Sequence, residues 1–303
     1  MKELFILQVT IFLLIAVGFL VKRIGLIGLQ GQKNLNDLVI YVVLPCNILK
    51  AFLGTSMEGQ IPAFLGILLI TMGIQAFCVI YGKLVFRGQG EGRRKCLEYA
   101  TICSNAGFLG NPIAEGVYGP EGLVLASIYL IPLRIMMWST GIAVFSGLTD
   151  RRQTIKRVLT HPCIIACALG IVMMAAKLTL PSGLMGGVSA LSSCNTALSM
   201  LVIGMILAEI NLRELWDWTA FLYSIHRLIL IPAVVYVVCR FLPVSRLVMG
   251  VSVLLAAMPA GATTSMLAEK YNCETTFATK LVILSTLLSL PSIALWSFIL
   301  RQF

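Results

Sequence analysis

Two apolar stretches of the chain combine residues that interrupt a helix with side chains that bind anions. The first contains Gly110-Asn111-Pro112, with Asn105 shortly before it, and the second contains Met258-Pro259-Ala260-Gly261, followed by Thr263 and Thr264. Proline removes a backbone donor, and glycine lets two backbones approach closely. A half-helix that starts at such a break presents free N–H groups and the positive end of its dipole. The two breaks therefore predict an anion site: Asn105, Asn111, Pro112, Pro259, Gly261, Thr263 and Thr264.

A proline kink without any ligand is the alternative for each break taken alone, because such kinks are frequent in membrane helices. Backbone without helical partners is tolerated at membrane depth only where protein or a water-filled cavity satisfies it. Two interrupted helices at corresponding places in two halves of a chain are typical of a transporter's binding site. We therefore expect the two breaks to form one site.

Arg134 is the charged residue that lies deepest in an apolar stretch, two residues after Pro132. A charge at the bilayer centre costs about 2.5–3.5 kcal/mol even on insertion scales, so it is expected to face a cavity or a partner. The planar guanidinium matches a carboxylate, which makes Arg134 a candidate substrate ligand. A structural ion pair with Glu115 or Glu269 explains the residue equally well.

Three other ionisable residues are weaker candidates for coupling transport to protons or ions. His226 titrates near neutral pH and could relay protons, although a structural role fits its position better. Glu115 and Glu269 could hold sodium, but both lie toward helix ends. No Walker loop, GxSxG, HExxH or cluster of histidine with carboxylates occurs. We therefore expect no enzymatic activity, no cofactor and no bound metal.

The elements that carry these residues are membrane helices. Apolar residues make up 58% of the 303 residues and charged residues 12%, against about 25% charged in an average soluble protein. The net charge of +10 lies in short loops, which membrane topology explains better than nucleic-acid binding. The fold class is an all-α polytopic membrane protein. Ten spans are expected near 4–21, 35–53, 61–86, 96–116, 121–147, 160–178, 184–208, 218–242, 246–270 and 275–300.

Lysine and arginine orient these spans. They are concentrated in the first, third and fifth loops, as in Arg93-Arg94-Lys95 and Arg151-Arg152, whereas the loops at 54–60 and 116–120 carry none. Positively charged loops stay on the cytoplasmic side. We therefore expect a protein of the cytoplasmic (inner) membrane with odd-numbered loops inside and both termini extracytoplasmic.

Short sequence similarities between the two halves indicate an internal repeat. Ala114-Glu115-Gly116 follows the first break as Ala268-Glu269-Lys270 follows the second, and Pro45-Cys46-Asn47 corresponds to Ser193-Cys194-Asn195. Two halves of five helices have opposite orientations because five is odd, which gives an inverted repeat. The repeat makes Asn195 the counterpart of Asn47, and both are candidate substrate-binding residues.

The motifs around both breaks resemble those of the auxin efflux carrier family, the PIN-like transporters. The matching pieces are Met258-Pro259-Ala260-Gly261, residues 268–272 and Leu290-Pro291 in the second half, and residues 105–112 with Val117-Tyr118-Gly119 in the first. The ten-span layout without a long central loop is similar to that of compact prokaryotic members.

The resemblance implies two inverted five-helix repeats, residues 1–147 and 160–303, joined by a cytoplasmic linker at 148–159. The broken helices four and nine would cross at their unwound centres, with Asn47 facing the crossing. Helices one, two, six and seven would form a scaffold that dimerises, and helices three to five and eight to ten would form a moving transport domain.

Two departures from the plant members bear on the substrate. Thr264 stands where they have a second proline, and Arg134 stands where they have an uncharged amide. Arg134 favours a more acidic substrate than auxin, such as a dicarboxylate.

We expect a secondary transporter (an efflux carrier or permease) of small organic anions, carboxylates of malate, malonate or auxin type. It would work by alternating access, in an elevator-like manner, as a homodimer in the lipid bilayer. The alternatives are a sodium-coupled organic-anion symporter with the architecture of bile-acid carriers and a membrane sensor that binds a ligand without moving it.

Overall fold

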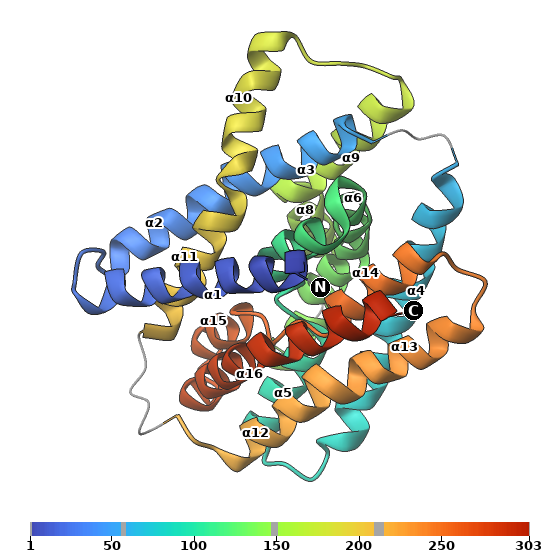
Figure 1. Cartoon of the computed structure of the whole chain (residues 1–303). Coiled ribbons are helices and arrows are strands. Elements are labelled where there is room, and N and C mark those ends of the chain that lie inside the picture. Colours follow the sequence, from blue (N-terminus) through green and yellow to red (C-terminus); the bar gives the residue numbers. More distant parts are fainter. Residues whose placement is uncertain (1, 56–58, 147–150, 209–214, 303) are drawn as a thin grey trace.

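The computed structural model describes residues 2–55, 59–146, 151–208 and 215–302, and Figure 1 shows their arrangement. In these ranges the regular elements are helices, apart from one isolated β-bridge. The α-helices are α1 (Lys2–Arg23), α2 (Leu29–Leu38), α3 (Leu44–Leu53), α4 (Ile61–Val85), α5 (Glu91–Ile102), α6 (Asn111–Met136), α7 (Ile142–Ser146), α8 (Arg151–Leu159), α9 (Pro162–Ala175), α10 (Ser182–Ser193), α11 (Asn195–Ala208), α12 (Trp218–Ile225), α13 (Ile231–Phe241), α14 (Arg246–Ala256), α15 (Thr263–Lys270) and α16 (Thr275–Gln302). Four π-turns join some of them: η1 (Val39–Val43), η2 (Ala106–Gly110), η3 (Met137–Gly141) and η4 (His226–Leu230).

Six helical runs within the described residues are long and apolar enough to cross a membrane. Two shorter apolar helices, Pro162–Ala175 and Arg246–Ala256, add to them. The prediction of an all-α, multi-pass membrane protein is therefore confirmed. The count of ten spans and the inverted repeat stay predictions. The six runs are Leu29–Leu53, Ile61–Val85, Ala106–Ser146, Ser182–Ala208, Trp218–Phe241 and Thr275–Leu300.

Gly119 divides the longest of these runs. Its 41 residues would exceed the thickness of a bilayer by about twofold as one straight helix. Gly119 has φ 69° and ψ −163°, a conformation that is open essentially to glycine alone. Pro120 follows directly, so the chain changes direction here, at the position where the sequence predicts the loop between the fourth and fifth spans.

Prolines explain three of the four π-turns. The α-helices that follow η1, η2 and η4 each have a proline in their first turn, namely Pro45, Pro112 and Pro232 in that order. A proline has no N–H for the carbonyl four residues before it and its ring clashes with that carbonyl. One extra residue in the preceding turn relieves the clash, and such π-bulges are frequent at functional sites.

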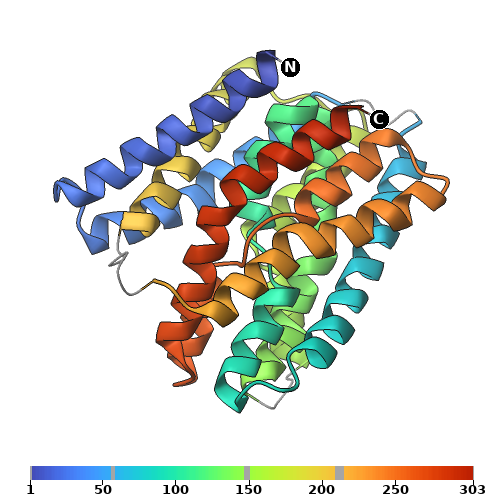
Figure 2. The same ribbon diagram turned by 60° about the horizontal axis from the view of Figure 1, so that its bottom comes forward.

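The helices pack in two groups, which Figure 2 shows from another side. In the first group, α1 packs along α11 and α3 packs against α9 and α10. A Cβ at Gly18 would stand 2.1 Å from the carbonyl oxygen of Leu201, and one at Gly204 would stand 2.0 Å from that of Ile15. These glycines let the backbones of α1 and α11 touch, as small residues do in membrane bundles.

The second group is built around α6 and α14. α4 packs against α6 and α14, and α16 packs against α12 and α15. Every residue of α14 from Val248 to Ala256 is buried, so this short helix has no lipid-facing side and is surrounded by protein. The buried core of this group therefore lies next to the two breaks, which follow the C-terminal ends of α5 and α14.

Candidate substrate site where two interrupted helices meet

Both stretches are interrupted, and the two interruptions are hydrogen-bonded to each other. The first lies at residues 103–105, whereas Gly110-Asn111-Pro112, where the sequence places it, lies inside the helical run of η2 and α6. α5 ends at Ile102 and α14 ends at Ala256. The amide of Asn105 donates to the carbonyl oxygen of Pro259 at 2.8 Å, and the amide of Gly261 donates to that of Cys103 at 2.9 Å. The antiparallel bridge between Ser104 and Ala260 thus satisfies backbone groups that have no helical partner at membrane depth.

Small side chains permit this close meeting of backbones. A Cβ at Gly261 would stand 3.1 Å from the carbonyl oxygen of Cys103, and one at Gly110 would stand 2.5 Å from Cδ2 of Leu255. Ser285 of α16 supports the break from behind, because its hydroxyl accepts from the amide of Ala260 at 3.2 Å. Sequence patterns do not single out Ser285, since its role depends on a neighbour 25 positions away.

Polar side chains without hydrogen-bond partners gather in the segments around and after the two breaks. Asn111 opens α6 and is fully buried, yet neither its amide oxygen nor its amide nitrogen has a partner. The hydroxyls of Thr264, at the start of α15, and of Ser104 are also buried without a partner, and that of Thr263 lies beside the phenol of Tyr99. Buried polar groups without partners are rare and costly. Their concentration at two helix N-termini indicates a place for a polar ligand.

Arg134 is brought to the same break from the far end of α6. Its Nη1 donates to Nε2 of His161 at 2.5 Å, and its Nε is buried without a partner. A Cβ at Gly107 would stand 3.2 Å from Nη2 of Arg134, so the guanidinium lies against the η2 turn. Among the described residues its partner is therefore His161 rather than Glu115 or Glu269.

His161 is a partner that the sequence does not reveal. It precedes α9 and is 27 positions from Arg134. Because arginine only donates, Nε2 of His161 accepts this bond, and Nδ1 accepts from the amide of Cys163 at 3.3 Å at the start of α9. The neutral histidine leaves the positive charge of Arg134 without an acidic counterpart in the described part of the chain.

Asn47 and Asn195 correspond to each other in the predicted repeat, and their side chains are hydrogen-bonded. Nδ2 of Asn195 donates to Oδ1 of Asn47 at 3.1 Å. Nδ2 of Asn47 in turn donates to Oε2 of Glu115 at 3.0 Å and to Oγ of Ser192 at 3.1 Å. Glu115 lies one helical turn after Asn111 on α6. This polar network joins α6 to α3, α10 and α11, next to the break.

The remaining predicted residues lie in different surroundings. Pro112 is buried in the first turn of α6, and Asn105 is half-buried just before η2. His226 is half-buried and its Nδ1 is hydrogen-bonded to the hydroxyl of Tyr81 on α4. Glu269 is exposed at the end of α15, away from Arg134.

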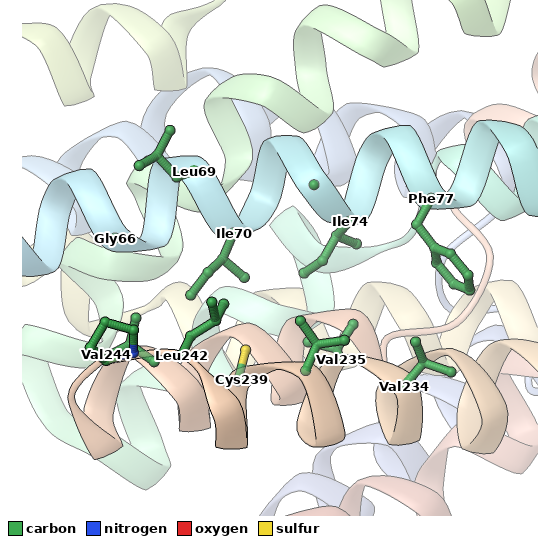
Figure 3. Close-up of a pocket in the computed structure, with 13 residues that line it drawn as sticks. Gly66, Leu69, Ile70, Ile74, Phe77, Val234, Val235, Cys239, Leu242 and Val244 are labelled. Atoms are coloured by element: carbon green, nitrogen blue, oxygen red, sulfur yellow. The ribbon is translucent and has the colours of Figure 1, made fainter.

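A cavity of about 480 Å³ between α4 and α13 does not belong to this site. Ile70, Ile74 and Phe77 point from α4 toward Val235 and Cys239 of α13 (Figure 3). Aliphatic and aromatic side chains offer an anion no hydrogen-bond donors. Since both helices are candidate membrane spans, this cavity suits hydrocarbon and not an anion.

Comparison with known proteins agrees with the geometry. A model of a family of membrane transport proteins matches residues 4–297. The chain belongs to this family. It is the family of the auxin efflux carriers, so the resemblance in the sequence is confirmed.

Two curated relatives are similar to the chain over most of its length. An uncharacterized transporter of Methanothermobacter thermautotrophicus is 29% identical over 296 residues, and one of Methanocaldococcus jannaschii is 27% identical over 299 residues. Each alignment covers 96% of both chains. The chain is therefore a membrane transport protein and not an enzyme.

Proposed function

We propose that this transporter moves small organic anions, specifically carboxylates, and binds them where its two interrupted helices meet. The observation that carries the proposal is the fully buried side chain of Asn111, whose amide has no protein partner. It lies about one turn inside the half-helix formed by η2 and α6, whose free N-terminal end is at Ala106. A helix N-terminus attracts negative charge. The unpaired hydroxyl of Thr264 at the start of α15 adds a donor from the other side.

Arg134 supports a carboxylate in particular. Its Nε is unpaired and its guanidinium lies against η2. A guanidinium binds a carboxylate in a two-pronged geometry and with a charge-assisted bond. With one carboxylate at the helix N-termini and a second near Arg134, a dicarboxylate such as malate or malonate fits this set of donors better than auxin does.

Transport is proposed to occur by alternating access, with one helix group moving against the other. The first group would be the dimerising scaffold (helices one, two, six and seven) of a ten-span inverted repeat, and the second the transport domain. The network of Glu115, Asn47 and Asn195 lies between the groups, and such hydrogen bonds can exchange as the groups slide. Both termini would be extracytoplasmic in the inner membrane.

Uptake into proteoliposomes tests the proposal. Purified protein would be offered a panel of radiolabelled monocarboxylates and dicarboxylates, with and without gradients of sodium and pH. We expect saturable uptake of at least one dicarboxylate, competed by unlabelled substrate and absent from empty liposomes. Binding without uptake would favour the ligand sensor, and neither binding nor uptake of any carboxylate would refute the proposal.

A sodium-coupled symporter is the second candidate, because one observation favours it. The carboxylate of Glu115 lies beside the amide of Asn47 and close to the hydroxyl of Ser192, and oxygen groups of this kind bind hard cations. Sodium-dependent uptake that becomes sodium-independent in Glu115→Gln would establish this form of coupling.

A further inference from the structure

Arg227 is a buried cation that contacts both interrupted helices from a third element. It lies in η4 and is only 2% exposed. Its Nε donates to the carbonyl oxygen of Met258 at 2.9 Å, and its Nη1 donates to that of Thr101 at 3.2 Å. Thr101 is in the last turn of α5, and Met258 follows Ala257, the C-cap of α14. One side chain therefore joins the C-terminal ends of two half-helices that are 157 positions apart in sequence.

The surroundings of Arg227 contain no acidic partner among the described residues. The titratable groups that interact with it are the thiols of Cys78 on α4 and Cys103 after α5, and the phenols of Tyr129 on α6 and Tyr223 on α12. Its neighbour in η4, His226, is bonded to Tyr81. The charge of Arg227 is thus balanced by carbonyl groups and by the negative ends of α5 and α14.

The sequence around η4 explains how Arg227 is held in place. Pro232 has no N–H for the carbonyl of Leu228, four residues before it. Nε1 of Trp296, on α16, donates to that carbonyl oxygen at 2.8 Å instead. The π-turn is therefore anchored to α16, and the guanidinium of Arg227 is directed toward the two breaks rather than toward lipid.

We propose that Arg227 is a positioning residue for the anion site, an inference that rests on the proposed function. Its positive charge neutralises the C-terminal ends of α5 and α14 and ties them together. The N-terminal ends of α6 and α15 keep their positive potential for the anion. Arg227 does not touch the substrate; it fixes the two backbones whose bridge shapes the site.

Charge variants of Arg227 test whether the positive charge is required. We expect Arg227→Gln to lower carboxylate uptake by about tenfold or more, and Arg227→Lys to retain a larger share. Arg87→Gln removes an exposed arginine from the loop after α4 and should leave uptake unchanged. Wild-type uptake by Arg227→Gln in correctly folded protein would overturn the proposal.

A titratable replacement separates charge from packing. In Arg227→His, uptake of a carboxylate that stays ionised should rise as the pH falls from about 8 to about 5, because protonation of the imidazole restores a positive charge at this position. Wild type and Arg227→Lys are measured in parallel and serve to subtract any contribution of His226. A profile for Arg227→His that parallels that of wild type would contradict a role for charge.

Hydrogen exchange provides a readout that does not depend on transport. The amides of Asn105 and Gly261 form the bridge between the breaks. We expect them to exchange faster in Arg227→Gln than in Arg227→Lys, measured on peptides that cover residues 99–106 and 256–262. If wild type moves no carboxylate but this difference is seen, the proposed function fails and the positioning role stands. Equal exchange in both variants would refute the positioning role.

Discussion

At the scale of single residues, the site depends on donors that have no acceptor in the protein. Asn111 is buried with its amide unpaired, and Arg134 keeps an unpaired Nε beside η2. Unsatisfied donors of this kind destabilise a fold unless a ligand uses them. A transporter must leave such groups open for its substrate, so this cost is expected at the site.

The change Asn111→Asp tests the sign of the charge that the site accepts. It preserves side-chain shape and adds a negative charge at the start of α6, where the helix dipole favours it. We expect carboxylate uptake to fall by about tenfold or more in protein that elutes as wild type does from size exclusion, because a buried like charge opposes an anion by more than about 1.4 kcal/mol. The midpoint of thermal unfolding should also fall, since the new carboxylate is buried without a partner.

The matched control is Asn34→Asp, which makes the same change at an exposed position of α2. Uptake by this variant should equal that of wild type. Undiminished uptake by Asn111→Asp would remove Asn111 from the substrate site.

The change Arg134→Ala tests whether this arginine binds substrate or only holds His161. We expect uptake to be lost while folding, measured by size-exclusion chromatography and thermal unfolding, is kept. In Arg134→Gln, dicarboxylates should lose more uptake than monocarboxylates, because only the second carboxylate would lack its partner. Full transport by Arg134→Ala would make the contact with His161 its whole role.

At the scale of elements, two short segments of extended backbone replace helix at the points where α5 and α14 end. Their mutual hydrogen bonds at 2.8 and 2.9 Å make each break depend on the other. A change that separates the two backbones is therefore expected to affect both halves of the chain.

The change Gly261→Ala tests this close approach. The added methyl group would stand 3.1 Å from the carbonyl oxygen of Cys103 and 3.4 Å from that of Ser104. Overpacking of this kind destabilises by about 1–3 kcal/mol, so we expect a lower midpoint of thermal unfolding and weaker uptake.

Gly186→Ala in the middle of α10 is its control, because nothing lies within 4 Å of the added methyl group. Alanine is a better helix former than glycine by about 1 kcal/mol, so this variant should be as stable as wild type or more stable. If Gly261→Ala behaved in the same way, the close approach would have no energetic consequence.

At the scale of the whole molecule, the arrangement of the helices decides which sides of the membrane the substrate can reach. The basic loops favour a cytoplasmic position for odd-numbered loops, and both termini would then be outside. This orientation follows from the distribution of lysine and arginine together with the expected ten spans, because an even number of spans puts both termini on one side.

Fusions to the C-terminus of the full chain test the orientation. In bacterial cells we expect a C-terminal alkaline phosphatase to be active and a C-terminal green fluorescent protein to be dark, since each folds on one side of the inner membrane only. At residue 90, in the third loop, fused alkaline phosphatase should be inactive and fused green fluorescent protein should be fluorescent. A fluorescent C-terminal fusion would reverse the assignment of every loop.

Much of the fold is readable from the sequence because its signals are local. Long apolar runs predict membrane helices wherever they occur, and Gly119-Pro120 ends one helix through its own backbone preference. Glycine and proline also predict that both stretches are interrupted, although the first interruption lies at residues 103–105 and not at Gly110-Asn111-Pro112. The partners of the site residues are not local, and for this reason His161, Ser285 and the contacts of Arg227 escape sequence reasoning.

The sequence by itself determined that this protein is a helical membrane transporter with two interrupted helices, because apolar length, glycine and proline act on their own segments of chain. Only the tertiary structure decided that Asn105 bonds to Pro259, that Asn47 bonds to Asn195 and that Arg134 meets His161. Hydrogen bonds between residues far apart in sequence depend on how the helices pack. That packing is a property of the whole chain, and no single motif encodes it.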